Sequence, residues 1–476
     1  MVRMHRWLVA GSALLFACGG DSAGPSGPPV LSSLNGASRP SATVGSTVVL
    51  EGSGFGAVQG SGEVLFSNGS GGTVAAVVQA GSDWSNTLIL TTVPAGAASG
   101  NVLVHTAEGS SAPLSFTLAQ GSAFSPSTIS WTATTDLPTA VSGEALVYAQ
   151  VGTSGTRVIW SLGGAGAGNA PITTVNYTTL GAGAGLGGWA ATTALPAALA
   201  FPAAVAATPG NSRVSAAGFL YVLGGATDAG GTPSAVVYRG ALAADGTVSA
   251  WAQVATLPAP LHSLGAVVFH GDLYVVGGAT SGNVPVATVY RSRISSAGDL
   301  GAWQAQAALP FRRAHFGFGV YGEYLYAVGG DSGTVAPNSG AQSNSAFSDV
   351  VYARISVQTG NLTAAGWSGT THLNKDRSKL SAELAGGSVL VTAGIYNGAS
   401  SGSSEESYAA LNVDGSVGSF NGATGSNTIA SLVGGGNLFN HAAVTYQDGL
   451  GLLHVLVAGG DDVNAPGTKH RGVFWY

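Results

Sequence analysis

The sequence predicts an all-β protein in which a small β-sandwich precedes a closed ring of six four-stranded sheets, a β-propeller. Three observations predict this fold class. The chain has 476 residues, of which 75 are glycine, and only 8% of its residues are charged. Short runs of Val, Thr, Leu and aromatic residues alternate with the glycines, which is typical of strands joined by tight turns. An apolar motif that ends in paired glycine recurs through residues 131–476.

Composition also excludes several classes of protein. Long helices are disfavoured, because glycine costs about 1 kcal/mol relative to alanine inside a helix. A hydrophobic content of 45% argues against a disordered chain, and the glycines lack the three-residue period of collagen. The net charge is −6 and only three residues are lysine. A nucleic-acid partner, which needs clustered Lys and Arg, is therefore not expected.

Residues 1–17 have the anatomy of an export signal. Two arginines, Arg3 and Arg6, precede an apolar run of 11 residues. That run is shorter than the roughly 20 residues needed to span a bilayer. It ends in Leu15-Phe16-Ala17-Cys18, which resembles a bacterial lipobox, although Phe16 stands where a small residue is usual.

The lipobox resemblance implies that Cys18 is lipidated and becomes the mature amino terminus. The alternative is an ordinary signal peptide with an incidental cysteine. Residues 18–28 are rich in Gly, Ser and Pro and are expected to form a flexible tether. We therefore expect an exported protein that is lipid-anchored in the cell envelope, and the lack of an acidic residue at Gly19 favours the outer membrane or cell surface. Because Cys18 is the only cysteine, no disulfide within the chain can hold the fold.

Residues 29–118 predict the sandwich, because short strands and turn signals alternate through them. A strand from Val44 runs into a glycine turn that presents Phe55, and further strands are expected around Val64–Phe66, Gly100–Val104 and Leu114–Phe116. The segment resembles an IPT/TIG domain in its stretches Val44–Gly56, Trp84–Ile89 and Val93–Val104 and in Phe116. In bacterial surface proteins such domains are usually spacers. Residues 119–130 are expected to be a linker.

Residues 131–476 contain six repeats, each of which carries three markers. The first marker is an apolar strand that ends in a glycine pair, as in Tyr274–Gly278, with Gly394-Ile395 as the degraded copy. An aromatic precedes each pair and a second aromatic follows it. The preceding aromatics are spaced by 52 to 64 residues and are Trp131, Trp189, Trp251, Trp303, Trp367 and Phe420.

A repeat of this length holds four strands, and we label them first to fourth in chain order. In the clearest repeat they are expected at Leu264–Phe269, Leu273–Val276, Val289–Ile294 and Trp303–Gln306. The region begins with a fourth strand at Trp131 and ends inside a third strand. Each of the six repeats therefore has four strands only if the strand at Trp131 is the fourth strand of the last sheet. This closure leaves no open sheet edge.

The repeats resemble Kelch repeats, including Arg312, Arg313 and His315 after Leu309-Pro310. The resemblance implies a six-bladed Kelch-type propeller. Among Kelch propellers, galactose-oxidase-like copper enzymes use a Tyr–Cys crosslink, and Cys18 is the only cysteine here. No copper or other cofactor is therefore expected. Sialic-acid mutarotases are six-bladed Kelch proteins, and Arg313, Asp331, Arg377 and Asp461 could supply acid and base groups of that kind.

In an antiparallel four-stranded repeat, the connection between the second and third strands and the connection to the next repeat emerge at the same end. Charged residues gather in these connections, including a long one from Asp331 to Asp349. Such residues can be charged simply because loops are exposed to solvent. Loops are also where binding and catalytic residues are often found. The candidate ligand-binding residues on this face are Arg312, Arg313, His315, Asp331, Lys375, Asp376, Arg377, Asp461 and Asp462.

No metal or nucleophile motif emerges from the sequence. His262, His315 and His441 follow repeat junctions without the spacing of a helical zinc site, which favours structural positions. Gly398–Gly402 matches G-x-S-x-G but lacks the strand-turn-helix of a nucleophile elbow. We therefore expect no catalytic residue and a monomeric, non-enzymatic binding or adhesion module that recognises glycan or protein. The alternative is a carbohydrate-active Kelch enzyme such as a mutarotase or epimerase.

Overall fold

The computed structural model describes most of the chain after its amino terminus. The described residues are 27–35, 40–42, 47–78, 84–94, 96–118, 126–152, 155–181, 185–208, 211–212, 214, 217–340, 345–356, 359–396, 405–412, 414–422, 429, 438–448, 452–462 and 468–476. The predicted signal segment, Cys18, most of the tether, residues 119–125 and the Gly398–Gly402 pattern lie outside them. Within these ranges no helix is long and apolar enough to cross a membrane.

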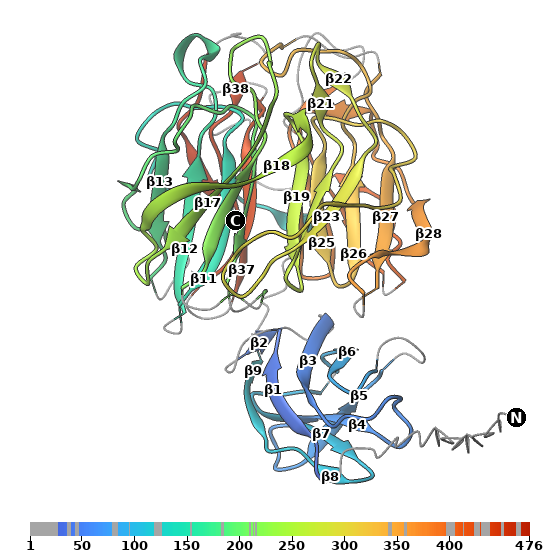
Figure 1. Ribbon diagram of the computed structural model, residues 1–476. Helices are drawn as coiled ribbons and strands as arrows, with labels where there is room; N and C mark the ends of the chain where they lie inside the picture. Colours follow the sequence, from blue (N-terminus) through green and yellow to red (C-terminus); the bar gives the residue numbers. More distant parts are fainter. Residues whose placement is uncertain are drawn as a thin grey trace, which may run out of the picture.

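The all-β prediction is confirmed. The described elements are strands, apart from two short 3-10 helices, η1 (Pro126–Thr128) and η2 (Ala167–Asn169). Figure 1 shows two units, a small one near the amino terminus and a large one that contains the carboxyl terminus. Residues of the predicted linker already belong to the large unit, because Ile129 is buried there beside Trp131.

The small unit is a sandwich of two sheets. One sheet has the order β1 (Val30–Leu34), β3 (Thr47–Ser53), β6 (Leu88–Thr92). The other has the order β2 (Ser41–Ala42), β9 (Leu114–Leu118), β7 (Gly100–Thr106), β4 (Glu63–Ser67), β5 (Thr73–Ala76), with β8 (Gly109–Ser110) also paired to β7. Only β2 and β9 pair in parallel; the other strand pairs here are antiparallel.

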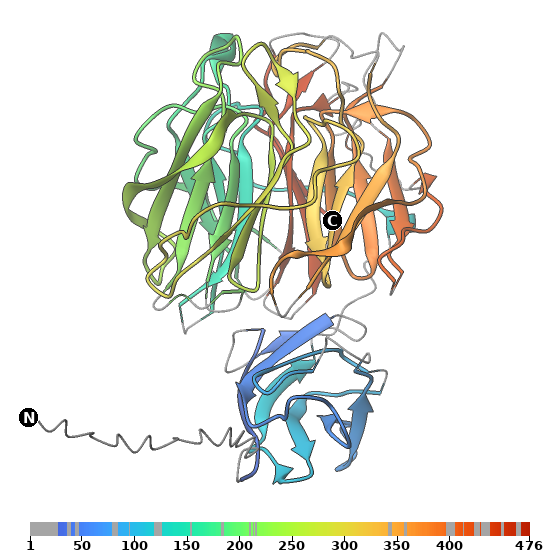
Figure 2. The same cartoon turned by 45° about the vertical axis from the view of Figure 1, so that its right-hand side comes forward.

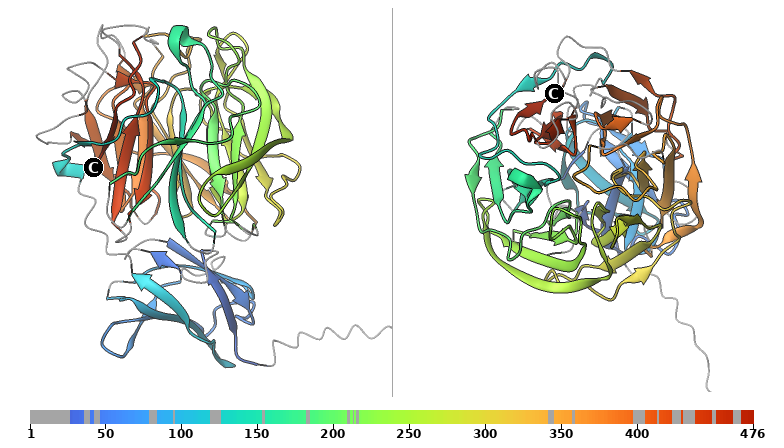
Figure 3. Two further views of the ribbon diagram at one scale, coloured as in Figure 1. Left: turned by 90° about the vertical axis from the view of Figure 1, so that its left-hand side faces the viewer. Right: turned by 90° about the horizontal axis from the view of Figure 1, so that it is seen from above.

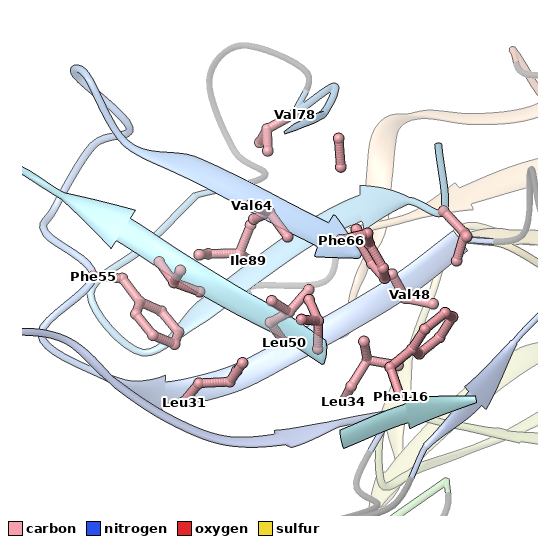
Figure 4. Packing of buried hydrophobic residues seen from close by; sticks show 14 of the residues in the cluster. Leu31, Leu34, Val48, Leu50, Phe55, Val64, Phe66, Val78, Ile89 and Phe116 are labelled. Atoms are coloured by element: carbon pink, nitrogen blue, oxygen red, sulfur yellow. The ribbon is translucent and has the colours of Figure 1, made fainter. Parts of the chain in front are cut away.

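One apolar core lies between the two sheets (Figure 4). Leu50, Phe66 and Phe116 are among its members, and the rings of the two phenylalanines meet edge to face at 5.1 Å. The sequence predicted that the glycine turn presents Phe55. The structure corrects this, because Phe55 is buried in the core and its carbonyl accepts a hydrogen bond from the Trp84 indole (2.9 Å).

The large unit consists of six four-stranded antiparallel sheets, numbered here in chain order. Sheet 1 is β11 (Ala145–Val151), β12 (Thr156–Leu162), β13 (Val175–Thr179), β14 (Ala190–Ala191). Sheet 2 is β15 (Ala203–Ala207), β16 (Phe219–Leu223), β17 (Ser234–Leu242), β18 (Val248–Leu261). Sheet 3 is β19 (Gly265–Phe269), β20 (Asp272–Val276), β23 (Val289–Arg293), β24 (Gln304–Ala305). Sheet 4 is β25 (Gly317–Tyr321), β26 (Tyr324–Val328), β27 (Val350–Ile355), β28 (Leu362–Gly369).

Sheets 5 and 6 complete the set. Sheet 5 is β30 (Ser381–Ala385), β31 (Ser388–Thr392), β33 (Glu406–Ala410), β34 (Asn421–Gly422). Sheet 6 is β36 (Ala442–Gln447), β37 (Leu453–Ala458), β39 (Val473–Trp475) and β10 (Thr132–Ala133). The strand pairing expected from the phase of the repeats is therefore present, with Thr132 opposite Trp475 and Ala133 opposite Phe474.

The six sheets stand around one axis (Figure 3, right). Each first strand contacts the first strands of the sheets before and after it, and β36 contacts β11, so the contacts close into a ring. Apolar clusters fill the interfaces between neighbouring sheets. We call this unit the six-sheet ring.

Two recurring hydrogen bonds join neighbouring sheets and explain the aromatic markers. The indoles of Trp189, Trp251, Trp303 and Trp367 each donate to a carbonyl in or just after the fourth strand of the preceding sheet, as Trp251 does to Thr193 (2.9 Å) and Trp367 to Ala307 (3.0 Å). A second-strand aromatic donates to a turn glycine of the next sheet, as Tyr221 does to Gly298 (2.5 Å). The markers therefore fix the spacing of the sheets as well as filling it.

The glycine pairs are required by the backbone. Gly277 and Gly278 have φ of 56° and 93°, a region that L-residues avoid. In sheet 5 the residues with the matching angles are Ala393 (47°) and Gly394 (104°). The predicted alignment of Gly394-Ile395 with the pair is therefore wrong by one residue, and an alanine holds the first position.

Short pairings at one end of the ring link the two kinds of connection that were expected to share an end. They include β29 (Arg377–Ser378) with β32 (Ile395–Tyr396) and β35 (Leu438–Phe439) with β38 (Asp461–Asp462). At the same end, β21 (Ala279–Thr280) and β22 (Val284–Pro285) form a hairpin within one connection. Figures 1 and 2 show this end pointing away from the sandwich, and we call it the distal end. The sandwich lies at the other end, where Val49 packs against Phe269.

Candidate functional site

A collar of six residues, one ahead of each first strand, surrounds the axis at the distal end. Their backbone amides and carbonyls form a closed cycle of six hydrogen bonds, of which Lys379 to His315 (2.8 Å) and Asn440 to Lys379 (3.2 Å) are two. Each has φ between 51° and 57°. The six collar residues are Gly143, Phe201, Ser263, His315, Lys379 and Asn440.

The collar is uniform in backbone and uneven in side chains. Sheets 1 to 3 contribute Gly, Phe and Ser, whereas sheets 4 to 6 contribute His, Lys and Asn. The residue after each glycine pair follows the same division, being alanine in sheets 1 to 3. Sheets 4 and 6 have aspartate there, at Asp331 and Asp461, and sheet 5 has Ile395. At these positions the histidine, lysine, asparagine and aspartate side chains are thus confined to one half of the ring, although the backbone is the same in both.

The polar half forms a buried network that we call the axial cluster: His315, Asp331, Lys379, Asn440 and Asp461. The Nδ1 of His315 lies 3.1 Å from Oδ2 of Asp331. The side-chain amide of Asn440 donates to Oδ2 of Asp461 (3.2 Å). Burial lowers the pKa of Lys379 to about 8, and Asp331 and Asp461 oppose that shift.

Part of the long connection in sheet 4, residues 336–339, closes over this cluster. The Nζ of Lys379 donates to the carbonyls of Ala336 (3.1 Å) and Ser339, and Asn440 donates to the carbonyl of Pro337 (2.8 Å). These carbonyls satisfy donors that would otherwise be buried without partners. The axial cluster is therefore internal in this structure.

Of the nine predicted ligand-binding residues, five are buried: Arg313, His315, Asp331, Arg377 and Asp461. The two arginines occupy equivalent positions two residues before the collar, where the other four sheets have Val or Leu. Arg313 donates to the carbonyl of Gly329, and Arg377 donates to that of Ala393 (3.4 Å). Both arginines therefore bind the backbone at the glycine pair and do not present their charge at the distal surface.

The other four predicted residues remain at the surface. Arg312 and Lys375 are exposed, and Asp376 and Asp462 are half-buried. Nζ of Lys375 lies 2.9 Å from Oε1 of Glu405, and both side chains are about half exposed. Surface pairs of this kind contribute little to stability, typically about 0–1 kcal/mol.

Beside them lies an aromatic pair that the sequence prediction missed. Phe311 is 59% exposed, and its ring stacks on that of Phe347 at 6.0 Å. Beneath Phe347 lies the guanidinium of Arg313, 4.5 Å from the ring centroid. Among the described residues, Phe311 is the only aromatic in the set of large exposed hydrophobic side chains.

Hydrogen bonds and ring contacts connect this pair to the Lys375 region. The carbonyl of Phe347 accepts from the amide of Arg377 (2.9 Å), and the Arg377 guanidinium lies 4.9 Å from the Tyr396 ring. The ammonium of Lys375 lies 4.6 Å from the same ring. We call Phe311, Arg312, Phe347, Lys375, Tyr396 and Glu405 the rim arc. Its residues come from the distal connections of sheets 3, 4 and 5.

Charge is not confined to the distal end. At the turns that face the sandwich, Arg291 and Arg293 pair with the buried Asp272 (3.0 and 2.9 Å), and Arg354 pairs with Glu323 (2.5 Å). These pairs join neighbouring strands of one sheet. The distal loops are therefore distinguished by the axial cluster and the rim arc, and not by charge as such.

The histidines are held by protein groups. His262 lies 3.1 Å from the Asn283 side-chain oxygen, and His441 lies 2.8 Å from Thr392. Burial lowers the pKa of each to about 3, so both are neutral. The described residues contain no group of three or more His, Cys, Asp or Glu that could hold a metal ion.

No family model matches the chain, and no curated protein matches it.

Proposed function

We propose that this chain is a lipid-anchored envelope protein that binds glycans through the rim arc. In this proposal the six-sheet ring is a six-bladed Kelch-type propeller, and the sandwich is an IPT/TIG-type spacer. Cys18 would carry the lipid, and residues 19–28 would tether the folded part to the membrane. The protein would act by binding, as a monomer and without a cofactor.

The observation that carries the proposal is the exposed Phe311 ring stacked on Phe347. Exposing a large apolar ring to water is unfavourable, so such a ring at a surface often marks a binding site. The face of an aromatic ring carries negative charge density, which attracts the polarised C–H groups of a pyranose. Arg312 follows Phe311 in the chain, Lys375 and Glu405 lie at the next sheet around the ring, and these polar groups can bond the hydroxyls. A flat surface that was apolar throughout would favour a protein ligand instead.

The arrangement of the two units supports the same function. The sandwich lies at the end opposite the rim arc (Figures 1 and 3). A lipid on Cys18 would be attached on the sandwich side of the protein, because the first described strand, β1, belongs to the sandwich. The distal end would then face away from the membrane, where extracellular glycans are met.

The test is binding to a glycan array, followed by titration of the best ligand against Phe311→Ala. We expect Phe311→Ala to weaken binding about tenfold or more, as truncation of a central aromatic does in other interfaces. Val284→Ala is the matched control, since Val284 is also an exposed apolar residue of a distal connection (38% exposed). Glycan binding that is unaffected by Phe311→Ala, or no glycan binding at all, would contradict the proposal.

A carbohydrate-active enzyme, such as a mutarotase or epimerase, is the second candidate. The observation in its favour is the axial cluster, where a lysine with a pKa of about 8 lies near the hydrogen-bonded His–Asp pair and could transfer a proton near neutral pH. Their coverage by residues 336–339 argues against it. Anomer exchange measured by NMR, present in the protein and lost in Asp331→Asn, would establish the enzyme. Arg377→Ala is a poor test, because Arg377 holds the backbone.

A further inference from the structure

A cavity of about 300 Å³ lies along the axis of the six-sheet ring and is open to solvent, and it shares no residue with the rim arc. All six first strands contribute to its wall. Most of the wall is aliphatic, from residues such as Leu146, Val268 and Leu384. A cavity of this size, lined by aliphatic side chains together with a few polar groups, is typical of a site for a small molecule.

One carboxyl group interrupts the aliphatic wall. The third residue of each first strand lies at the same level of the ring, since the strands start in the same register against their second strands. It is valine in four sheets, glycine in sheet 4 and glutamate in sheet 5. The six residues are Val147, Val205, Val267, Gly319, Glu383 and Val444. Four sheets form with valine here, so the ring does not require a carboxyl group at this level.

Glu383 has no cationic neighbour in the cavity. The hydroxyl of Thr445 donates to its Oε2 (2.8 Å). The described residues that line the cavity include no Lys, Arg or His, and Tyr148 is their only other titratable side chain. A carboxylate held among protein groups without an opposite charge is unfavourable, and an added cation would relieve that cost.

We propose that this cavity binds a small aliphatic ammonium compound, whose nitrogen pairs with Glu383 and Thr445 and whose alkyl chain packs against the valines. The ammonium supplies the charge that the wall lacks, and the apolar chain replaces water along aliphatic surface. A carboxylate ligand would place like charges together. A neutral alcohol would gain the apolar contact without the ion pair. The cavity therefore distinguishes these ligands by charge.

The proposal includes a pH dependence with a definite sign. Burial raises the pKa of Glu383 to about 7, and the Thr445 hydrogen bonds oppose this. Below pH 7 the carboxyl is protonated and must release its proton before it can pair with an ammonium ion, whose own pKa is about 10.4. Affinity should therefore fall about tenfold for each pH unit below 7 and level off above it. Tyr148 stays neutral, because burial raises its pKa.

The experiment is calorimetric titration of the full chain with hexylammonium chloride and with hexan-1-ol at pH 5.5, 7 and 8. We expect hexylammonium to bind at pH 8 at least tenfold more tightly than hexan-1-ol, and to weaken as the pH falls. Glu383→Gln should abolish the preference for the amine and the pH dependence. Glu63→Gln makes the same change of charge on the sandwich and should change neither.

Equal affinities for the amine and the alcohol would overturn the proposal, and so would amine binding unaffected by Glu383→Gln. Absence of binding by either probe would also overturn it. To separate a lost site from a lost fold, the Tm of Glu383→Gln is compared with that of the native chain at pH 5.5, where both side chains are neutral and we expect equal values. The glycan test at the rim arc uses different residues, so either proposal can fail alone.

Discussion

Sheets 1–3 and sheets 4–6 of the ring place different side chains on equivalent backbone positions. The collar has the same φ and the same cyclic hydrogen bonds throughout. In the first half its side chains are Gly, Phe and Ser, and alanine follows each glycine pair. In the second half the collar has His, Lys and Asn, and Asp331 and Asp461 follow two of the pairs.

The difference separates what the fold requires from what it only tolerates. A feature present in both halves, such as the second glycine of each pair, is required by the backbone. A feature present in one half, such as the axial cluster, is compatible with the fold without being needed for it. Buried charges are also costly unless they are paired. The polar half is therefore where a function is most readily expected, and each half can be used as the control for the other.

Replacing the second glycine of the pair with alanine should have the largest effect, and an equal one in both halves. A Cβ at Gly278 would lie 2.9 Å from the His262 carbonyl, and one at Gly330 would lie 2.7 Å from that of Ala314. Both glycines also have φ near 90°. We expect Gly278→Ala and Gly330→Ala each to cost about 3 kcal/mol, from strain and overpacking together. Thermal unfolding measures this.

Gly369→Ala is the control for both variants, since a Cβ there meets nothing within 4 Å. It should leave Tm nearly unchanged. If Gly330→Ala were tolerated while Gly278→Ala was not, the two halves would not share one backbone requirement, and the comparison would fail.

A smaller effect is expected when the polar pair of sheet 4 is replaced by the pair of sheet 3. Asp331→Ala leaves His315 without its acceptor, and we expect a loss of about 2 kcal/mol. The double variant His315→Ser with Asp331→Ala recreates Ser263 and Ala279 of sheet 3, and should recover at least about 1 kcal/mol of that loss. Chemical denaturation of Asp331→Ala, His315→Ser and the double variant gives the coupling free energy between the two side chains. A double variant less stable than Asp331→Ala would show that the fold itself needs the polar pair.

The repeated backbone was predictable from the sequence because its requirements are local. A glycine pair, a following aromatic and a preceding tryptophan each satisfy a need within one repeat or between adjacent ones, so they recur visibly. The phase of the repeats then sufficed to predict that the strand after Trp131 pairs with the last strand. The sandwich strands were found for the same reason, since their alternating burial follows residue by residue, as in Glu63–Ser67.

The site was predictable only in part, because its burial depends on contacts distant in sequence. Arg313 and Asp331 were assigned to the surface, as charged residues usually are. Lys379 gave no signal as part of a site, since the carbonyls that cover it lie about 40 residues away in the chain. Phe311 gave no signal either, because nothing in the sequence beside Leu309-Pro310 distinguishes an exposed phenylalanine from a buried one. Its exposure appears only in the structure.

The smallest predicted effect concerns Ala393, which the comparison of the repeats did not assign to the glycine pair. It holds the position that glycine occupies in the other five sheets, with φ of 47° and no exposure. The left-handed conformation costs an L-residue about 1–2 kcal/mol, and the greater freedom of glycine in the unfolded chain offsets about 0.5–1 kcal/mol of that. Ala393→Gly should therefore stabilise the ring by about 0.5 kcal/mol and raise Tm slightly. Ala327→Gly, at an equally buried position within β26, should instead lower it. If both variants lowered Tm, sheet 5 would have adapted to its alanine, and its backbone would not be equivalent to that of the other sheets.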